Sequence, residues 1–544
     1  MAVHLPIVDQ FLREQQDLRA ALRFSSAHSA LKQQEARTYG ELIPLTAPRP
    51  GEQYAFHVDL DACSGCKACV VACNKLNGLD PGEGFRAVGT IVGGARGAPV
   101  VQTVTAACHH CVDPACAKGC PVGAYEKDAA TGIVRHLDDQ CIGCQYCTLT
   151  CPYEVPKYNA RLGIVRKCDM CSGRLAEGEA PACVQSCPNG AITIRVVDQA
   201  QALADAQADT FLPGAPSPGL TVPTTTYTSK RPLPRDALPV DFYAVRPAAH
   251  HLPLVVMLVL TQLAVGAYLV DWVLRALRPE AQDAALHRAH SLTALALAVL
   301  ALGAATLHLG RPLYAFRAVL GLRTSWMSRE IVAFGVFAKL AVLDAALSVA
   351  PDFWERTGVP AALGASVDGL TRGVAAAASV TGLVGLGCSA MIYIVTGKAF
   401  WSAASTGLRF LGTTAVLGLA VAASLALLGG APWAGSLAVS AGAFLLGKVL
   451  CEAGVLTHLL DKQQGPLKRT ALLVVGELRP VALGRLALGV FGAAVLVAAT
   501  RGPSTTASIV VAVAALCLLT FGELLERSLF FTALSSPRMP GGLR

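Results

Sequence analysis

Eight long apolar segments fill the second half of the chain and dominate its pattern of hydrophobic and polar positions. As α-helices of about 20 residues, each would be about 30 Å long, which matches the hydrocarbon core of a bilayer. The segments cover residues 252–274, 290–309, 329–350, 373–395, 410–429, 435–457, 482–500 and 508–530. This pattern predicts an all-α membrane domain of eight transmembrane helices over residues 251–532 and a cytoplasmic tail over residues 533–544.

The first half of the chain is polar and follows a different pattern. Between residues 51 and 200, β-type stretches such as AFHVDL, GIVRHL and AITIRVV alternate with loops that carry cysteines, which predicts an α+β domain. Residues 1–50 contain FLREQQDLRAALRF, whose apolar positions follow helical spacing, so an N-terminal arm is expected there. Residues 201–250 are rich in proline, which predicts an extended linker that lies along a surface.

The Lys and Arg residues between the apolar segments indicate the orientation. With the polar domain inside, thirteen of them fall in inner loops and the tail, against six in outer loops. Inner loops of membrane proteins are enriched in these residues. The N-terminus also has no secretory apolar region. We therefore expect a multi-pass protein of the cytoplasmic (inner) membrane, with the polar domain on the cytoplasmic side.

Composition agrees with a polypeptide in two parts. A mean hydropathy of +0.49 with 15% charged residues is too apolar for one soluble domain. The net charge of +8 is modest, and no basic stripe is interleaved with aromatic residues, so no nucleic-acid partner is expected. Arginines near the ends of apolar segments suit a lipid bilayer instead.

Sixteen of the 19 cysteines lie in four closely spaced groups. The groups are Cys63, Cys66, Cys69 and Cys73; Cys108, Cys111, Cys116 and Cys120; Cys141, Cys144, Cys147 and Cys151; and Cys168, Cys171, Cys183 and Cys187. The third has the C-x2-C-x2-C-x3-C-P spacing of bacterial ferredoxins, and the last three groups all end in Cys-Pro. Zinc ribbons, the alternative, use paired C-x2-C units without a third cysteine two residues on. Sixteen thiolates at four per cluster therefore predict four [4Fe–4S] clusters.

In the ferredoxin pattern the fourth cysteine of a group binds the neighbouring cluster. Crosswise ligation would pair the first group with the fourth and the second with the third, in a double ferredoxin-like domain. The predicted ligand sets are Cys63, Cys66, Cys69 and Cys187 (site 1); Cys73, Cys168, Cys171 and Cys183 (site 2); Cys108, Cys111, Cys116 and Cys151 (site 3); and Cys120, Cys141, Cys144 and Cys147 (site 4).

These motifs resemble the four-cluster electron-transfer subunit of dimethyl sulfoxide reductase-type molybdoenzymes. CSGCKACVVACN, CHHCVDPACAKGCPVGA and CIGCQYCTLTCPY carry the likeness, which covers residues 55–200. Some relatives have tryptophan where this chain has Cys144 and hold a [3Fe–4S] cluster, so the resemblance implies four [4Fe–4S] clusters here. The membrane half resembles the anchor subunit of the same reductases, an eight-helix quinol oxidase, through LHLGRP…AF, SREI, MIYIVTGKAFW and GELLERSLFF.

Two ionisable residues border apolar segments on the side of the cysteine domain. His308 ends the second segment and Glu330 opens the third. Ionisable groups at membrane depth are costly unless paired or hydrated, which makes both functional candidates. Quinol oxidation needs one group that hydrogen-bonds the quinol oxygen and one that accepts a proton. The other interpretation is an interfacial histidine and a glutamate paired with Arg329 or Arg311.

The resemblance matches His308 and Glu330 to the family's quinol-site histidine and glutamate. A family arginine that follows the histidine motif is out of register here, where Tyr314 takes its place, so Arg311 or Arg317 is expected to substitute. Other ionisable residues lie inside the apolar segments. Lys448 and Glu452 are expected to pair with each other in a structural role. Asp344, and Glu523 with Glu526 and Arg527, are expected to form either packing pairs or part of a proton route.

The predicted function is that of a non-catalytic subunit in anaerobic respiration, which oxidises quinol (menaquinol or ubiquinol) and passes electrons through the clusters to a partner. The resemblance alone implies that this partner is a molybdopterin-containing catalytic subunit. One alternative is reverse flow, from a soluble dehydrogenase or hydrogenase to the membrane quinone pool. A proton-translocating subunit would need a continuous polar path across several spans, and a redox-sensing module would need a signalling domain.

Overall fold

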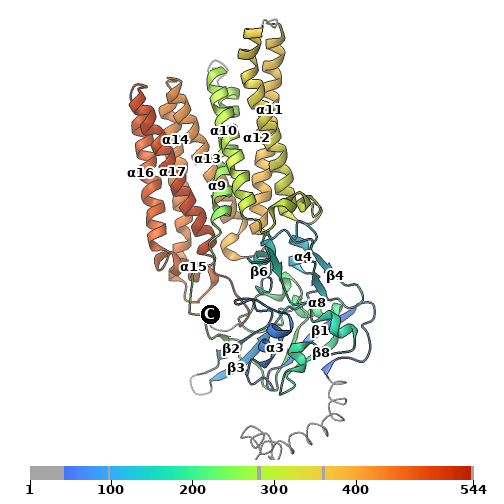
Figure 1. Ribbon diagram of the computed structural model, residues 1–544. Helices are drawn as coiled ribbons and strands as arrows, with labels where there is room; N and C mark the ends of the chain where they lie inside the picture. The colour runs from blue at the N-terminus through green and yellow to red at the C-terminus, as the bar shows by residue number, and fades with distance from the viewer. Residues whose placement is uncertain (1–41, 96–98, 278–283, 358–361, 541–544) are drawn as a thin grey trace, which may run out of the picture.

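The computed structural model describes residues 42–95, 99–277, 284–357 and 362–540, with only the backbone for residues 351–357 and 362–368. Most of the predicted N-terminal arm and the last four residues of the tail lie outside this part of the protein. The described residues form a bundle of long helices that stands on a smaller α+β domain (Figure 1). Both predicted parts are therefore confirmed.

The α+β domain is framed by two small sheets. In the first, β1 (Glu52–Asp59) pairs antiparallel with β8 (Ile192–Asp198) and parallel with β9 (Thr226–Thr228). Strand β1 buries Gln53 and Ala55 on one face and Phe56 and Val58 on the other, so both of its faces are covered within the domain. The second sheet and two short hairpins are formed by β10 (Leu238–Pro239), β2 (Ala87–Gly93) and β3 (Val100–Ala106), by β4 (Tyr125–Lys127) with β5 (Val134–His136), and by β6 (Lys157–Asn159) with β7 (Ile164–Arg166).

The segment predicted to be a surface linker is partly built into this domain. It supplies β9 and β10 to the two sheets. Thr221, Val222 and Thr224 are buried, and the Thr224 hydroxyl donates to the His109 carbonyl at 2.8 Å. Residues 201–207 belong to helix α8 (Gln199–Gln207), and the extended segments that follow add to the edges of two sheets.

The eight predicted transmembrane helices are confirmed within the described residues. They are α9 (Leu252–Leu277), α10 (Ala284–Leu307), α11 (Trp326–Thr357), α12 (Ala362–Ile394), α13 (Ala403–Leu428), α14 (Ala434–Ala453), α16 (Arg479–Arg501) and α17 (Thr506–Thr532). A short helix that the apolar pattern did not predict, α15 (Pro466–Val475), lies between α14 and α16 at the end near the α+β domain (Figure 1). We call this the inner end of the bundle.

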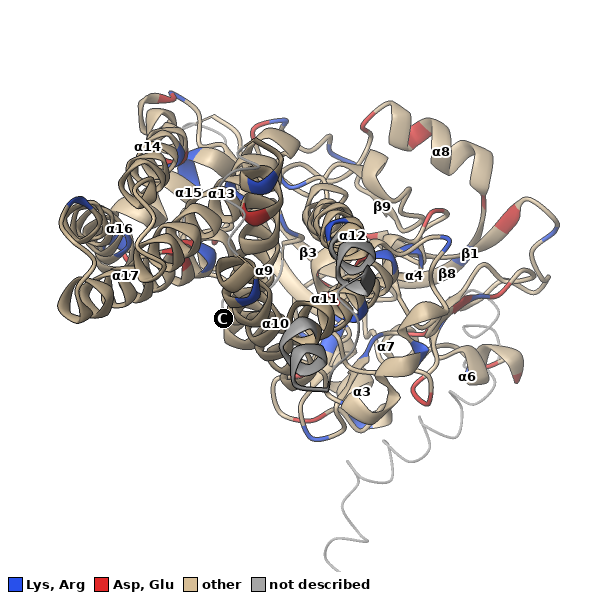
Figure 2. Ribbon diagram, turned by 90° about the horizontal axis from the view of Figure 1, so that it is seen from above, with Lys and Arg blue, Asp and Glu red and all other residues tan. Residues whose placement is uncertain are grey.

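Seen from above, α10, α11 and α12 stand over the α+β domain, whereas α14, α16 and α17 lie to one side (Figure 2). Helices α9 and α13 join the two halves. A Cβ on Gly266 of α9 would lie 2.2 Å from the Thr414 carbonyl oxygen of α13. Small residues allow this backbone contact. In lipid no hydrophobic effect drives helices together, so close packing of this kind is a main source of stability for helix pairs.

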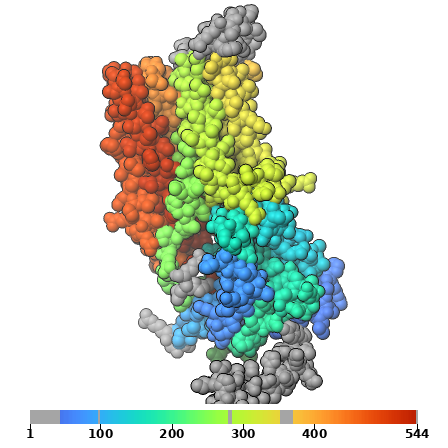
Figure 3. Space-filling view, viewed as in Figure 1, coloured from blue at the N-terminus to red at the C-terminus, as the bar shows by residue number. Residues whose placement is uncertain are grey.

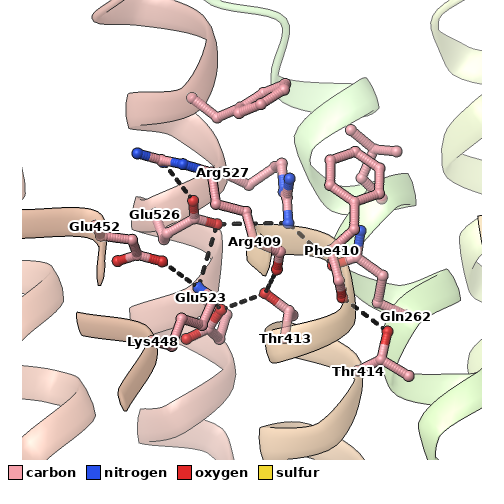
Figure 4. A network of polar contacts seen from close by, with 12 residues as sticks. Gln262, Arg409, Phe410, Thr413, Thr414, Lys448, Glu452, Glu523, Glu526 and Arg527 are labelled. Atoms are coloured by element: carbon pink, nitrogen blue, oxygen red, sulfur yellow. Dashed lines mark hydrogen bonds and ion pairs between the residues drawn. The ribbon is translucent and has the colours of Figure 1, made fainter. Parts of the chain in front are cut away.

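Seven charged side chains from α13, α14, α16 and α17 meet near the inner end of the bundle. Figure 4 labels all of them except Arg485. Lys448 Nζ lies 2.6 Å from Glu452 Oε1, as predicted, and 2.7 Å from Glu523 Oε2. Glu526 accepts from Arg409 at 2.7 Å. The network is completed by Arg485, 2.8 Å from Glu452, and Arg527, whose Nη2 donates to Gln262 at 3.0 Å. Mutual pairing makes so many buried charges tolerable in a membrane.

A second buried polar group ties α9, α10 and α11 together at the opposite end. His287 Nδ1 lies 2.9 Å from Asp271 Oδ2, and Ser291 donates to Asp344 at 2.6 Å. Between this group and the inner end, Phe334 and Phe337 of α11 pack in the apolar core.

Replacing Lys448 with methionine tests the inner network. The variant leaves Glu523 with one fewer cation, and breaking a buried pair costs about 3–5 kcal/mol of unfolding free energy. We expect a loss of that size in detergent unfolding curves. Lys462→Met, which removes an exposed lysine at the same end of the bundle, is the control and should stay near wild type. Equal stability of the two variants would contradict a stabilising role for the network.

Candidate electron-transfer path

The four cysteine loops share one unusual backbone feature. The residue before the second cysteine of each group has positive φ: 74° at Gly65, 41° at His110, 70° at Gly143 and 61° at Met170. Glycine adopts this conformation without cost, whereas His110 and Met170 carry strain of order 1–3 kcal/mol. The same turn in four loops indicates four sites of one kind.

A short helix follows each loop and directs the last cysteine of the group. In the second and third groups, α4 (Ala115–Gly119) and α5 (Tyr146–Thr150) end directly before Cys120 and Cys151. Both cysteines have extended backbones, with ψ of 120° and 113°, because the proline that follows each disfavours the helical conformation. The helix therefore stops, and the fourth thiol points away from its own group.

Two predicted ligand sets line cavities. The four cysteines of site 3 border one of about 370 Å³, and the four cysteines of site 2 border another of about 270 Å³. Each cavity thus combines cysteines from two different groups, in the crosswise manner that the ferredoxin pattern predicts.

The remaining two sets are also brought together. In site 1, Cys63 lies within electrostatic reach of Cys187, and in site 4, Cys144 lies within reach of Cys120 and Cys141. Burial, with some help from neighbouring thiols, raises the pKa of Cys144 to about 12. Buried thiols of this kind become thiolates only beside positive charge, which bound iron supplies.

Backbone amides point at several of the sulfur atoms. The N–H of Ala124 donates to Cys120 Sγ at 3.2 Å, and the N–H of Ala191 donates to Cys187 Sγ at 3.3 Å. Such N–H···S contacts stabilise the negative charge of thiolate ligands and tune bound iron–sulfur clusters. The donor set, the cavities and these contacts all fit [4Fe–4S] clusters.

Site 4 lies against the membrane domain through three glycines. A Cβ on Gly310, just after α10, would lie 2.2 Å from the Gly163 carbonyl oxygen, and a Cβ on Gly143 would lie 2.9 Å from the Gly310 Cα. Next to them, the Arg311 N–H donates to the Ile142 carbonyl at 3.0 Å. Backbones can approach this closely only without side chains.

The rest of the segment after α10 continues this contact, and in the space-filling view it lies between the helices and the α+β domain (Figure 3). Arg311 and Arg317 donate to the carbonyls of Asp138 and Asp139, each at 2.8 Å. These two arginines therefore bind the cysteine domain. Tyr314 is 42% exposed, with the Arg317 guanidinium 4.6 Å from its ring.

His308 and Glu330 both approach site 4. His308 directly follows α10 and interacts with the Cys144 backbone, and burial lowers its pKa to about 4, so the ring is neutral near neutral pH. Glu330 lies in the first turns of α11, is 5% exposed and faces Ser389 of α12. Both Glu330 Oε1 and Ser389 Oγ lack a hydrogen-bond partner in the described structure.

The alternative of a glutamate paired with a nearby arginine does not match these contacts. Arg329 donates to the carbonyls of Leu322 and Arg323, and Arg311 donates to that of Asp138. Among the described residues no ion pair involves Glu330, so this buried carboxyl group with an unpaired oxygen is a candidate for ligand binding.

Tyr146 is a site residue that the sequence pattern did not single out. It lies between Cys144 and Cys147, is 2% exposed, and its hydroxyl donates to the Ile392 carbonyl of α12 at 2.9 Å. Glu330 is among its electrostatic neighbours. Tyr146 thus connects the cysteine loop of site 4 with Glu330 and helix α12. The only signal in the sequence was an aromatic residue within the third cysteine group.

Comparison with known families assigns both halves of the protein. The family described as 4Fe-4S dicluster domain matches residues 100–197, and the family described as DMSO reductase anchor subunit matches residues 246–533. The second match covers more than half of the sequence.

Curated relatives match the cysteine domain. A probable anaerobic dimethyl sulfoxide reductase chain of Escherichia coli is 42% identical over 155 residues, which cover 27% of this protein and 75% of the relative. An anaerobic dimethyl sulfoxide reductase chain of Haemophilus influenzae is 38% identical over 157 residues, or 27% and 76% of the two proteins. The iron-sulfur subunit of formate dehydrogenase-O from Escherichia coli is 34% identical over 172 residues, or 28% and 56%.

The glycine contact can be tested by adding one methyl group. Gly310→Ala should push the segment after α10 away from the loop of site 4, because the new Cβ would overlap the Gly163 carbonyl. We expect faster deuterium exchange of the Arg311 amide, which the contact protects. Gly303→Ala is the control, since a Cβ there meets nothing within 4 Å. Unchanged exchange in Gly310→Ala would show that the contact is not close.

Proposed function

This protein belongs to the family of dimethyl sulfoxide reductase anchor subunits, and we propose that it carries electrons from membrane quinol to a molybdopterin-containing catalytic subunit. It joins that anchor to the iron–sulfur electron-transfer subunit of the same type of complex in one polypeptide. Beyond this family assignment, we propose the electron donor, the direction of electron flow, the number of clusters and the catalytic partner.

The pocket around Glu330 carries the quinol proposal. A quinol releases two electrons and two protons when it becomes a quinone, so its pocket needs a proton acceptor next to an electron acceptor. The unpaired Glu330 carboxylate and Ser389 hydroxyl supply polar partners for one quinol hydroxyl, and Glu330 accepts its proton. The neutral His308 ring, beside Cys144, is placed to hydrogen-bond the other hydroxyl and to accept the second proton as the quinone forms.

Four [4Fe–4S] clusters, one at each cysteine site, are proposed to form the path. Site 4 is next to the pocket through His308 and Tyr146. Tyr125 lies near cysteines of both site 4 and site 3, and Lys167 near cysteines of both site 3 and site 2. Site 1 completes the series, with the exposed Cys66 at its surface. This order takes electrons away from the membrane.

The names of the relatives support the partner and leave one alternative. Relatives called dimethyl sulfoxide reductase chains favour flow from quinol to a reductase, and the relative called a formate dehydrogenase subunit favours the opposite direction. The distribution of Lys and Arg supports a cysteine domain on the cytoplasmic side. Reduction of the clusters by added quinol, compared with their reduction by candidate soluble donors, separates the two directions.

Purification of the full-length protein in mild detergent, from cells that express its native neighbours, tests the cofactors and the partner together. We expect about sixteen irons per polypeptide, at four per cluster. A large co-purifying subunit with stoichiometric molybdenum or tungsten is also expected. Full iron content without such a subunit or metal would contradict the molybdoenzyme partner and favour a different electron exchange partner.

Glu330→Gln tests the pocket. The amide fills the same space but cannot accept a proton, so the rate of quinol-driven cluster reduction should fall by about 10²- to 10⁴-fold. Iron content and reduction by dithionite should stay normal. Glu477→Gln, which alters an exposed glutamate at the inner end of the bundle, should keep the wild-type rate. A normal rate in Glu330→Gln would place quinol oxidation elsewhere.

A further inference from the structure

Two buried cations lie between the cysteine sites, apart from the quinol pocket. Arg86 is 3% exposed and Lys167 is 5% exposed. Neither belongs to the predicted iron ligands. Among the described residues, neither forms a hydrogen bond or ion pair with Glu330 or His308. Full burial of a charged side chain costs several kcal/mol unless the surroundings compensate for it. Both residues have cysteines of the predicted sites among their close neighbours.

Arg86 lies between site 1 and site 2. Its guanidinium stacks on Phe56 at 4.6 Å from the ring centroid, and Nη1 donates to Thr105 at 3.2 Å. Nε and Nη2 have no hydrogen-bond partner, and the residue lines the cavity of site 2. Among its electrostatic neighbours are Cys69 of site 1 and Cys183 of site 2. An arginine with two nitrogen atoms that have no partner among the described residues, beside a cavity, is suited to an anionic occupant.

Lys167 lies between site 2 and site 3. Its Nζ is 3.6 Å from Cys108 Sγ of site 3 and donates to the carbonyl of Cys168, a site 2 cysteine, at 2.6 Å. It also donates to the Val134 carbonyl, and it lines the cavity of site 3. The ammonium group is therefore held by two backbone carbonyls at the boundary between the two sites.

We propose that Arg86 and Lys167 are tuning residues that raise the reduction potentials of the clusters on either side of them. A [4Fe–4S] cluster with four thiolate ligands is anionic, and reduction adds one more negative charge. A fixed positive charge nearby stabilises the reduced form more than the oxidised form, and a low dielectric strengthens this effect. This inference rests on the proposed function, with its four clusters, and adds which residues set the reduction potentials of those clusters.

The geometry places each residue between a different pair of sites, and the two pairs have site 2 in common. Arg86 acts on sites 1 and 2, and Lys167 acts on sites 2 and 3, so the cluster of site 2 is raised by both. At the next boundary, between sites 3 and 4, the neutral Tyr125 takes the corresponding place. The cluster of site 4 should thus respond to neither substitution.

Redox titration of the purified full-length holoprotein, followed by electron paramagnetic resonance, tests this pattern. Lys167→Met and Arg86→Gln should each lower the midpoint potentials of two clusters, with one shifted cluster common to both variants. Lys167→Arg and Arg86→Lys keep the charge and should shift the potentials less. Lys118→Met is the control, because this lysine is 63% exposed in its side chain and water screens its charge.

Iron analysis of the same samples separates the possible failures. Full iron content with unchanged potentials in both neutral variants would overturn the tuning role and leave the proposed clusters intact. A wild-type protein with far fewer than about sixteen irons would instead contradict the cluster assignment itself. If Lys167→Met loses iron, Lys167→Gln, which keeps hydrogen-bond donors, carries the test, and Arg86 supplies an independent one.

Discussion

The close contact between the site 4 loop and the segment after α10 is the constraint on which the rest of the structure depends. Electron transfer slows steeply with distance, and in the proposed function this contact keeps Glu330 and His308 close to the cluster of site 4. Gly143 meets two requirements at once: its φ of 70° forms the cysteine loop, and its missing side chain admits Gly310. Any other residue would satisfy at most one of them, because side chains disfavour that φ and fill that space.

Pairing of buried charges separates structural from functional polar groups in the membrane domain. At the inner end of the bundle, Lys448 lies within 2.7 Å of both Glu452 and Glu523, and Arg485 supplies a second positive charge for these two carboxylates. Glu330, equally buried, has an unpaired oxygen although Arg329 is its neighbour in the sequence. The carboxylates of the inner network share ion pairs with four cations, whereas no ion pair involves Glu330 among the described residues, which is why we propose a functional role for this carboxylate.

The sequence predicted features that are set by local spacing. Cysteine spacing indicated which thiols meet, because Cys-Pro ends a helix and turns the fourth thiol outward. Apolar length indicated the eight helices. The sequence did not indicate the glycine contact or Tyr146, because both depend on how two domains approach, and that information is spread over Gly143, Gly163 and Gly310. It also failed to show that β9 joins β1, since an edge strand of three residues has no periodicity to detect.

Fusion changes how strong the contact between the domains has to be. In the Escherichia coli relative, the matching residues make up 75% of the polypeptide, so the iron–sulfur part is a separate subunit there. A separate subunit must hold its place by affinity alone. Here the backbone enters the bundle next to its exit, with the Ala248 N–H donating to the Thr532 carbonyl at 2.9 Å. The tail then returns to the cysteine domain, where Arg538 pairs with Asp241 at 2.8 Å and Met539 packs in the core. The polypeptide is therefore connected to the cysteine domain both before α9 and after α17, so the contact between the two domains is intramolecular. A contact made largely of backbone carbonyls, glycines and two arginines is then sufficient to keep the site 4 loop beside the pocket.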